Sequence, residues 1–502
     1  MVAMPDVSRP EPIRPCRTCV PVASLTGPLS RSAEELRLLN KVGGGLEVRA
    51  DVIGDVDPMT LRDHVSGELT YSLRGMGAGG VYAGSCEQRE QRMIAAAQHY
   101  DLIELEVGRD TTPRLLSAIP PHQRVLAWYG LSSAGGASGM DLAGLHGKFN
   151  QMAEVAARRY LLVTHAATAE HALAPLRLLR SVNRTDVTAF SVGETGSCGR
   201  LLAPLLGAPV VYGQIGGRPE EAPSIERLIR DYPFPDVPLV RRLYGIVGRS
   251  VHTSLSPRMH NSAYRAIGYP GLYLPIATRD FLTTWRVLTS GLAELGFPLD
   301  GATIVAPYKE AALRLGEVTS AAAAGSGAAN VLVRTESGWR AHTTDPIGVV
   351  GALGRAGIRL TGRKAAVVGC GGAGRGAAAG LLRFGVTPTL VNRGPDRGMR
   401  AARLLGLDYV PLNRFVPGDY SLIVHATPVR DELLFPLGQL ARDTILVDLT
   451  YGRRPTALVA AARRRRLRVI DGWEVLRIEV ARQFRLMTGR SMPNPHSLEH
   501  VR

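Results

Sequence analysis

Lysine is nearly absent from this 502-residue chain, which has 60 lysine and arginine residues but only four lysines, Lys41, Lys148, Lys309 and Lys364. The net charge of +16 therefore comes almost entirely from arginine. Such an excess could favour nucleic acids, but general arginine usage and affinity for small anions account for it without them. The densest run, residues 463–466, lies in an alanine-rich helical stretch and is interpreted as a solvated helix face. We expect no nucleic-acid partner.

Paired cysteines and long apolar runs are also missing. The five cysteines form no disulfide framework, and Cys16 and Cys19 make a lone Cys-x-x-Cys, so no metal is expected. Because we find no signal peptide and no run of membrane-spanning length, we expect a cytoplasmic protein with no membrane partner, monomeric or homodimeric. The hydrophobic share of 45% and aromatic share of 6% fit an α/β protein with an adequate core.

A glycine-rich turn between two apolar runs is the first strong feature that is present. Residues 365–368 have the composition of a buried parallel strand, and residues 375–383 have that of a helix. A glycine turn at this junction places backbone N–H groups and the positive helix end against a pyrophosphate. The pattern predicts a Rossmann dinucleotide-binding domain, although a turn without a ligand would have the same composition. The turn residues are Gly369, Gly371, Gly372, Ala373 and Gly374.

The end of the following strand indicates which dinucleotide is bound. Residues 389–391 are followed by Asn392 and Arg393, where an NAD-binding protein usually has an acidic residue. A carboxylate there holds the ribose 2′-hydroxyl, whereas an arginine suits a 2′-phosphate. The sequence therefore predicts NADP(H) as the cofactor.

The first part of the chain alternates short apolar runs with helix-like segments, which is typical of a (β/α)8 TIM barrel. The catalytic groups of such barrels lie at the carboxyl ends of the strands. The expected strands are residues 20–23, 45–50, 69–73, 102–106, 125–128, 160–164, 187–191 and 209–212.

Charged residues follow three of these strands, and a glycine loop ending in an arginine follows the seventh. Together they resemble type I 3-dehydroquinate dehydratase over residues 18–232, in the segments Leu-Glu-Val-Arg-Ala-Asp at 46–51, Ser-Leu-Arg at 72–74, Glu-Leu-Glu at 104–106 and Gly-x-x-Gly-x-x-Gly-Arg at 193–200. The resemblance implies a barrel that bound an anionic sugar acid. The anion-binding remnants are Glu47, Arg49, Arg74, Glu106 and Arg200.

The two catalytic groups of that family are missing from their expected positions. Leu161 stands where the imine-forming lysine is expected on the sixth strand, and Gly130 where the histidine base is expected on the fifth. Leucine has no amine to form an imine, and glycine cannot move a proton. Lys148 is a remote candidate replacement, and His165 is interpreted as a strand-end or core histidine. We therefore expect an inactive scaffold or binding domain and regard dehydratase activity as doubtful.

The second half carries polar groups suited to hydroxy-acid redox chemistry. Ser254 and Ser256 precede a helix-like segment, where two hydroxyls and the positive helix end suit a carboxylate. Lys309 follows Pro-Tyr at a helix start, and Asp345 follows a β-rich run. A lysine beside an aspartate near a nicotinamide can exchange a proton with an alcohol during hydride transfer. Each residue alone would fit an N-cap, a turn or a surface ion pair equally well.

The order of these motifs resembles shikimate dehydrogenase over residues 242–492, and the barrel ahead of it matches the bifunctional dehydratase/dehydrogenase arrangement. The resemblance implies Lys309 and Asp345 as the catalytic pair and Ser254 and Ser256 as carboxylate binders. It also implies substrate contacts from Asn330, Tyr451 and Glu479. The glycine turn, Asn392, Arg393 and Thr427 would then hold NADP(H).

Several positions depart from that family. Val305 lacks the hydroxyl of the expected threonine, His425 replaces an asparagine, and Glu479 stands where a substrate-facing glutamine is expected. A lost hydrogen bond costs on the order of 1–3 kcal/mol, so recognition of the substrate is expected to differ. The ligand could be shikimate, quinate or a related hydroxy acid.

We expect a tail at 1–17, the barrel at 18–232, a linker at 233–241, a substrate domain at 242–345, a Rossmann domain at 346–475 and a returning C-terminal helix at 476–502. The leading hypothesis is an NADP-dependent dehydrogenase of the shikimate type. The alternatives are a two-step enzyme that also dehydrates 3-dehydroquinate, with Lys148 as rescuing amine, and a ligand sensor without catalysis.

Overall fold

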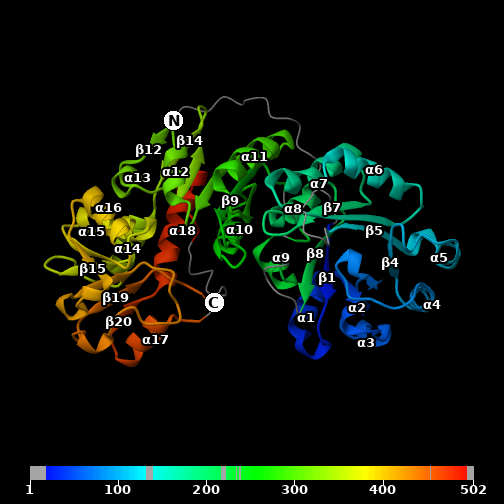
Figure 1. The fold of residues 1–502 in the computed structure, drawn as a ribbon, viewed down its shortest axis with the longest axis horizontal. Coiled ribbons are helices and arrows are strands. Elements are labelled where there is room, and N and C mark those ends of the chain that lie inside the picture. Colours follow the sequence, from blue (N-terminus) through cyan, green and yellow to red (C-terminus); the bar gives the residue numbers. More distant parts are fainter. Residues whose placement is uncertain are drawn as a thin grey trace. The chain divides into compact units, whose positions relative to one another are not determined.

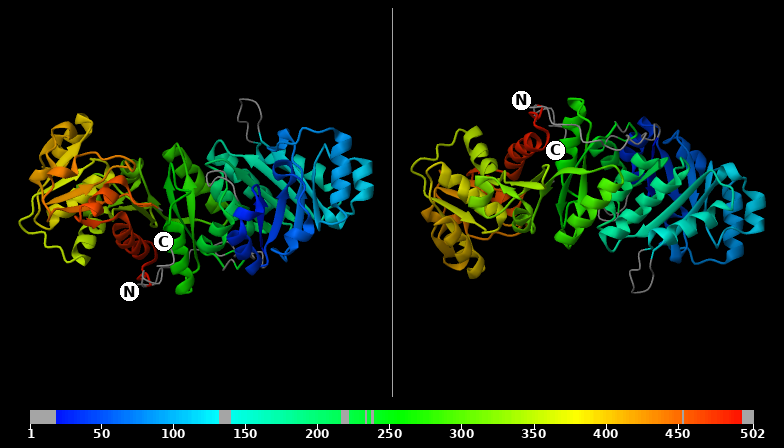
Figure 2. Two further views of the ribbon diagram at one scale, coloured as in Figure 1. Left: turned by 90° about the horizontal axis from the view of Figure 1, so that it is seen from below. Right: turned by 90° about the horizontal axis from the view of Figure 1, so that it is seen from above.

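The computed structural model describes residues 19–131, 140–215, 222–232, 234–236, 239–452 and 454–493 (Figures 1 and 2). Its contacts divide the chain into two compact units. The N-terminal unit comprises Met1–Gly245 and Ser250–Leu299, and the C-terminal unit comprises Ile246–Arg249 and Asp300–Arg502. Cys16 lies outside the described residues. The finer division expected from the sequence remains a prediction.

The N-terminal unit contains an eight-stranded parallel sheet that forms a nearly closed α/β barrel, with strand order β7-β6-β5-β4-β3-β2-β1-β8. All eight expected strands are confirmed, with ends that differ from the expected bounds by no more than three residues. Apolar side chains such as Val125, Ala127 and Val163 alternate along the strands and fill the interior. The strands are β1 (Val20–Leu25), β2 (Gly45–Arg49), β3 (Leu69–Ser72), β4 (Leu102–Glu106), β5 (Arg124–Gly130), β6 (Arg159–His165), β7 (Val187–Val192) and β8 (Val210–Ile215).

Helices follow the barrel strands, and polar N-caps fix where several of them begin. Ser85 forms a reciprocal capping box with Gln88, and Thr112, Asp141, Thr168 and Ser224 each accept a backbone N–H at a helix start. The helices are α1 (Ala33–Lys41), α2 (Ala50–Ile53), α3 (Pro58–Arg62), α4 (Cys86–Ala96), α5 (Pro113–Ala118), α6 (Leu142–Ala153), α7 (Ala169–Val182), α8 (Ser197–Leu202) and α9 (Ile225–Asp231).

The N-terminal unit also contains α10 (Ser256–Ala266), β10 (Gly271–Ala277) and α11 (Phe281–Glu294). Helix α11 packs against barrel helix α7. The contact is close at Gly291, where a Cβ atom would lie 2.2 Å from Leu173 Cδ1. A side chain at Gly291 would therefore push the two helices apart.

A second sheet has the strand order β10-β9-β11-β13-β14-β12. Strand β13 pairs antiparallel with both β11 and β14, whereas β12 pairs parallel with β14. Its strands other than β10 are β9 (Arg242–Gly248), β11 (Leu299–Ile304), β12 (Val318–Thr319), β13 (Val331–Arg334) and β14 (Trp339–His342). The helices that accompany it in the C-terminal unit are α12 (Lys309–Leu315), α13 (Ala321–Ser326) and α14 (Asp345–Arg355).

The third sheet is fully parallel, with strand order β17-β16-β15-β18-β19-β20. The direction in which successive strands are added reverses at β15, which places a ligand crevice at the carboxyl end of that strand, as in doubly wound folds. Helix α18 packs against α14. The elements are β15 (Ala365–Val368), α15 (Gly372–Arg383), β16 (Pro388–Asn392), α16 (Pro395–Leu405), β17 (Tyr409–Pro411), β18 (Leu422–His425), β19 (Ile445–Asp448), α17 (Ala457–Arg464), β20 (Arg468–Ile470) and α18 (Gly472–Thr488).

The predicted Rossmann strand–turn–helix at residues 365–383 is confirmed: β15 has the expected bounds, and α15 begins within the glycine turn. Among helices built by the described residues, none has both the length and the apolar character that crossing a membrane requires.

Candidate active site and barrel cavity

Lys309 and Asp345 form an ion pair inside the C-terminal unit. Lys309 is the first residue of α12, and Asp345 is the first residue of α14. Lys309 Nζ lies 2.7 Å from Asp345 Oδ1 and 2.8 Å from Oδ2. Both side chains are largely buried, with 14% of Lys309 and 3% of Asp345 exposed. The lysine and aspartate predicted from the sequence are therefore brought together.

A buried amide fixes the position of the aspartate. Asn330 Nδ2 donates to Asp345 Oδ1 at 2.9 Å and to Thr344 Oγ1 at 3.0 Å, while Thr344 N donates to Asn330 Oδ1 at 2.8 Å. Gln483 Nε2 donates to the same Thr344 hydroxyl at 3.3 Å. The described side-chain hydrogen bonds of Asn330, which was expected to touch substrate, thus go to Asp345 and Thr344. Sequence reasoning missed Thr344, whose only signal was its place beside Asp345.

The glycine helix α15 packs directly on this pair. A Cβ atom at Gly372 would lie 3.0 Å from Lys309 Cβ and Cδ, and one at Gly376 would lie 2.5 Å from Asp345 Cβ. Glycine at these two positions lets the helix backbone approach both residues, because a Cβ atom would overlap Asp345 at Gly376 and crowd Lys309 at Gly372. The start of the predicted cofactor helix and the predicted catalytic pair therefore form one site within this unit.

Glu479 introduces a second carboxyl group near the ion pair. It lies on α18, where a Cβ atom at Gly348 of α14 would approach its Oε1 to 2.7 Å. Burial and the negative charge of Asp345 raise the pKa of Glu479 to about 8, although the positive charge of Lys309 opposes this shift. A carboxyl with this pKa is largely protonated at neutral pH and can donate a hydrogen bond.

The glycine turn has the geometry that a dinucleotide phosphate requires. Gly369 has φ +109°, and a Cβ at Gly374 would lie 1.8 Å from Gly369 O, so both positions require glycine. Gly371 caps α15 without a side-chain hydrogen bond, and no atom lies within 4 Å of its Cβ position. The first N–H groups of α15, which includes Ala373, have no partner earlier in the helix, and the open space beside Gly371 leaves room for an anion.

Asn392, the last residue of β16, and Arg393, which follows it, have different surroundings. Asn392 Oδ1 accepts from Cys370 N at 3.1 Å, and its Nδ2 donates to Gly394 O at 2.8 Å, so Asn392 stabilises the turn. Arg393 is exposed at the end of the strand, where it can meet a 2′-phosphate. These residues fit NADP(H).

His425 links the ends of two neighbouring strands to Thr427. His425 Nε2 lies 2.6 Å from Thr427 Oγ1, and its Nδ1 lies 3.0 Å from Asp448 Oδ1. Burial opposes ionisation of Asp448, but His425 together with hydrogen bonds from Thr456 and the Thr450 N–H lowers the pKa of that carboxyl. Thr427 is thus held beside Gly369, where a Cβ would lie 2.9 Å from Thr427 Cγ2. Tyr451 is half-buried and packs against Trp473, with ring centroids 5.9 Å apart.

The two serines expected to bind a carboxylate belong to the N-terminal unit. Ser256 begins α10, and its N–H donates to Ser254 Oγ at 3.2 Å. Both residues are buried, with 7% of Ser254 and 2% of Ser256 exposed. Their hydroxyls lie at a helix start, as the sequence predicted.

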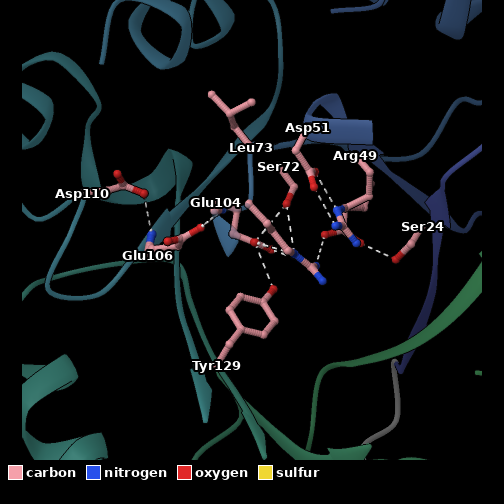
Figure 3. Close-up of polar contacts among 12 residues, drawn as sticks. Ser24, Arg49, Asp51, Ser72, Leu73, Glu104, Glu106, Asp110 and Tyr129 are labelled. Carbon is pink, nitrogen blue, oxygen red and sulfur yellow. Dashed lines mark hydrogen bonds and ion pairs between the residues drawn. The ribbon is translucent and has the colours of Figure 1, made fainter. Parts of the chain in front are cut away.

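The barrel contains a buried cluster of carboxylates and arginines (Figure 3). Arg74 Nε donates to Glu104 Oε1 at 3.0 Å, and its Nη2 pairs with Glu47. Tyr129 Oη donates to Glu104 at 2.9 Å under the Arg74 guanidinium. Burial favours the neutral form of both acids, but Arg74 and Arg49 lower the pKa of Glu47. Glu104, which also faces the Glu47 charge, has a raised pKa.

A cavity of about 1030 Å³ lies at the carboxyl ends of the barrel strands and includes residues 278–280, 283 and 284. Arg49, Arg74 and Arg200 line it. Arg200 Nη1 donates to Tyr212 O at 3.1 Å, and among the described residues no carboxylate pairs with it. Burial and the Arg74 charge lower the pKa of Arg200 to about 10, which still leaves it charged. This cavity can therefore bind an anion.

Glu106 is separated from the other remnants. Its Oε1 accepts from Gly75 N at 2.7 Å and lies 3.1 Å from Arg89 Nη2, and it is not a cavity-lining residue. Arg49 forms an ion pair with Asp51, in which Arg49 Nη2 lies 2.8 Å from Asp51 Oδ2. Of the five expected remnants, the structure thus places Glu47, Arg49, Arg74 and Arg200 in or beneath the cavity.

No lysine of the described residues lines the cavity. Leu161 does, and Lys148 donates to Gln151 on α6 with its Nζ 5.7 Å from the Trp128 ring centroid. Tyr129, rather than Gly130, is the β5 residue that faces the cavity, and His165 lines its rim as an exposed strand end. Within the parts of the chain that the structure describes, no group of three or more His, Cys, Asp or Glu side chains could hold a metal ion.

Comparison with known proteins gives two family matches. Residues 18–230 match type I 3-dehydroquinase, and residues 246–332 match the shikimate dehydrogenase substrate binding domain. A shikimate dehydrogenase (NADP(+)) from Acidiphilium cryptum is 34% identical over 243 residues, covering 47% of this chain and 86% of that protein. One from Xanthomonas oryzae pv. oryzae is 36% identical over 261 residues, covering 49% and 90%.

A longer relative covers both units. The chloroplastic bifunctional 3-dehydroquinate dehydratase/shikimate dehydrogenase of Arabidopsis thaliana is 23% identical over 521 residues, covering 96% of this chain and 83% of that protein. Among solved structures, shikimate 5-dehydrogenase from Thermus thermophilus in complex with NADP(H) and shikimate is 32% identical. The match covers 52% of this chain and 97% of the Thermus thermophilus chain, with a TM-score of 0.46.

Fold and site together define a dinucleotide-binding α/β oxidoreductase preceded by an α/β barrel. By its matches, the chain belongs to the shikimate dehydrogenase family and carries a type I 3-dehydroquinase barrel ahead of that region. The barrel match and the Arabidopsis relative also favour a dehydratase domain. They do not bear out the doubt that the missing lysine raised about that activity.

Proposed function

We propose that this protein catalyses NADP(H)-dependent interconversion of shikimate and 3-dehydroshikimate, or of a closely related hydroxy acid, in aromatic amino acid biosynthesis. The observation that carries this proposal is the Lys309–Asp345–Asn330 array packed against the glycine turn of α15. The shikimate dehydrogenases (NADP(+)) to which the chain is similar support the same reaction class. Residence in the cytoplasm stays a prediction.

Lys309 is the proton donor in this mechanism. Its ammonium has three N–H groups, and the two oxygens of Asp345 occupy two of them. The third is available to a substrate oxygen, so Lys309 can protonate a carbonyl oxygen as that carbon is reduced. In the reverse direction the same nitrogen accepts the alcohol proton, and Asp345 stabilises the ammonium that forms.

Recognition of NADP(H) is assigned to the start of α15 and to Arg393. The uncapped N–H groups at Gly371 and Gly372 would hold the pyrophosphate, and Arg393 would pair with the 2′-phosphate. When bound, the cofactor supplies or accepts the hydride. Ser254 and Ser256 would hold the substrate carboxylate through hydroxyl donors at the start of α10.

Substrate choice within this class depends on Glu479. As a protonated carboxyl, Glu479 donates one hydrogen bond where an amide could donate two, so hydroxyl recognition is altered. NADP reduction measured by absorbance with shikimate, quinate and their deoxy analogues tests the proposal. Turnover of at least one of these acids, absent without NADP, is expected, and no turnover of any of them would reject the function.

The barrel has a second candidate function, dehydration of 3-dehydroquinate, which is favoured by the anion-binding cavity with Arg200. Because no lysine of the described residues lines that cavity, we infer that any such dehydration proceeds without an imine. Borohydride added with 3-dehydroquinate should leave the protein mass unchanged. A mass increase that matches a reduced substrate adduct on a lysine would contradict this inference.

A further inference from the structure

We propose that the last barrel helix, α9, positions the substrate-binding turn of the dehydrogenase, with Arg227 as the positioning residue. Helix α9 follows β8 and belongs to the barrel, whereas the turn at residues 249–255 joins β9 to α10 and carries Ser254. Helix α9 and Ser254 both belong to the N-terminal unit. The inference rests on the proposed role of Ser254 and Ser256 as carboxylate binders.

Arg227 supplies hydrogen bonds that the turn does not make by itself. Its Nη2 donates to Ser254 O at 2.7 Å, and its Nη1 donates to His252 O. The turn is irregular, and a backbone bond from Ser254 N to Val251 O, 3.1 Å long, closes it. A planar guanidinium reaches two carbonyl groups at once with fixed geometry, which an isolated loop would not hold.

The arginine is itself held rigidly. Arg227 Nε donates to Asp231 Oδ2 at 2.7 Å, and the Asp231 side chain is fully buried. The other oxygen of Asp231 accepts from Arg258 Nε, and Arg258 lies on α10, the helix that Ser256 begins. One buried carboxylate thus joins an arginine on α9 to an arginine on α10.

A third contact fixes the same helix pair. Asn261 Nδ2 on α10 donates to Asp231 O at 2.9 Å and to Tyr273 O at 3.0 Å, while Tyr273 N donates to Asn261 Oδ1 at 2.8 Å. The end of α9 is therefore linked through α10 to β10. The start of α10, which bears Ser256, therefore depends on the barrel for its position and angle. The barrel would have this structural role even if it catalysed no reaction.

Removing an arginine that only stabilised the fold would lower the amount of active protein, and hence the apparent kcat, without a selective change in KM. Removing one that positions the serine turn would weaken binding of the acid. Arg227→Ala should raise KM for shikimate at least tenfold and change kcat and KM for NADP by less than threefold. Arg227→Lys, which can still reach one carbonyl, should recover part of the loss. Arg230→Ala is the matched control, because Arg230 lies on the same helix, is exposed and pairs with Glu226 at 3.0 Å.

Activity of the parent separates the two proposals. If the parent turns over shikimate and a folded Arg227→Ala protein keeps the parent KM, the positioning role is rejected while the function stands. If the parent turns over no acid, the function itself fails. Circular dichroism reports folding, and if Arg227→Ala does not fold, Arg227→Lys decides: an unchanged KM for shikimate rejects the role, and a selective rise supports it.

Discussion

Lys309 Nζ contacts both carboxylate oxygens of Asp345, at 2.7 and 2.8 Å, while Asn330 donates to one of those oxygens at 2.9 Å. The aspartate is thereby fixed from behind, and the ammonium cannot rotate freely. A proton donor held in one orientation needs little reorganisation when its substrate binds. We therefore expect the reaction rate to depend on the amine of Lys309.

Replacing Lys309 by alanine should lower kcat for shikimate oxidation by about 10²–10⁴-fold, the usual contribution of a positioned acid or base. Lys309→Arg keeps a positive charge beside Asp345, but the pKa of a guanidinium is too high for it to donate and accept the proton as the lysine does. This variant should therefore be nearly as inactive. Steady-state kinetics at saturating NADP measures both. Lys364→Ala is the control, since Lys364 is an exposed lysine elsewhere in the same unit. Full activity in Lys309→Ala would remove this lysine from the mechanism.

The pH dependence of substrate binding should follow Glu479. Its pKa is raised to about 8 by burial and by Asp345, so the carboxyl donates a hydrogen bond below that pH and becomes a charge above it. KM for the anionic substrate should therefore rise as pH increases through 8. Glu479→Gln keeps a donor at all pH values and should remove this rise. A KM profile unchanged by Glu479→Gln would show that another group titrates.

The stability of the fold should also depend on pH through the Glu479 carboxyl, and its raised pKa fixes the direction of that dependence. In the unfolded chain the carboxyl ionises near its ordinary pKa of 4.5, whereas the folded protein retains the proton until about pH 8. Rising pH therefore favours the unfolded state throughout that interval. Glu479→Gln should match the parent near pH 4 and exceed it at about pH 8 by several kcal/mol, because each unit of pKa difference contributes about 1.4 kcal/mol. Denaturant unfolding at the two pH values measures the difference.

Much of the fold could be predicted from the sequence because the information was local. Strand β15 and the barrel strands are short apolar runs, and their bounds follow from periodicity and turn residues. The role of Asn330 could not be read in this way, because its partners Thr344 and Asp345 lie in a different element and emerge only from packing. Arg227 had no signal at all, since its two carbonyl partners are backbone atoms that any sequence would provide.

Two neighbouring glycines should respond differently to the same substitution. A Cβ at Gly374 would lie 1.8 Å from Gly369 O, so Gly374→Ala should destabilise the C-terminal unit by at least about 1–3 kcal/mol. Gly371 has no atom within 4 Å of its Cβ position, so Gly371→Ala should unfold at the parent's temperature. If a pyrophosphate binds in that open space, Gly371→Ala should still raise KM for NADP. Thermal melting and cofactor titration together distinguish the two effects, and a normal KM for NADP would move the phosphate site elsewhere.

Preference for NADP over NAD should depend on Arg393. This arginine is exposed after β16, and Asn392 beside it is committed to the turn through Cys370 N and Gly394 O, so of this pair only Arg393 offers a charge to a 2′-phosphate. Arg393→Ala should weaken NADP binding at least tenfold, because a charge-assisted hydrogen bond contributes roughly 1.5–3 kcal/mol, and should leave NAD binding nearly unchanged. Arg403→Ala, at an exposed position in the last turn of helix α16, provides a control of equal charge change. Equal losses for both cofactors would show that Arg393 supports the fold of the turn rather than recognising the phosphate.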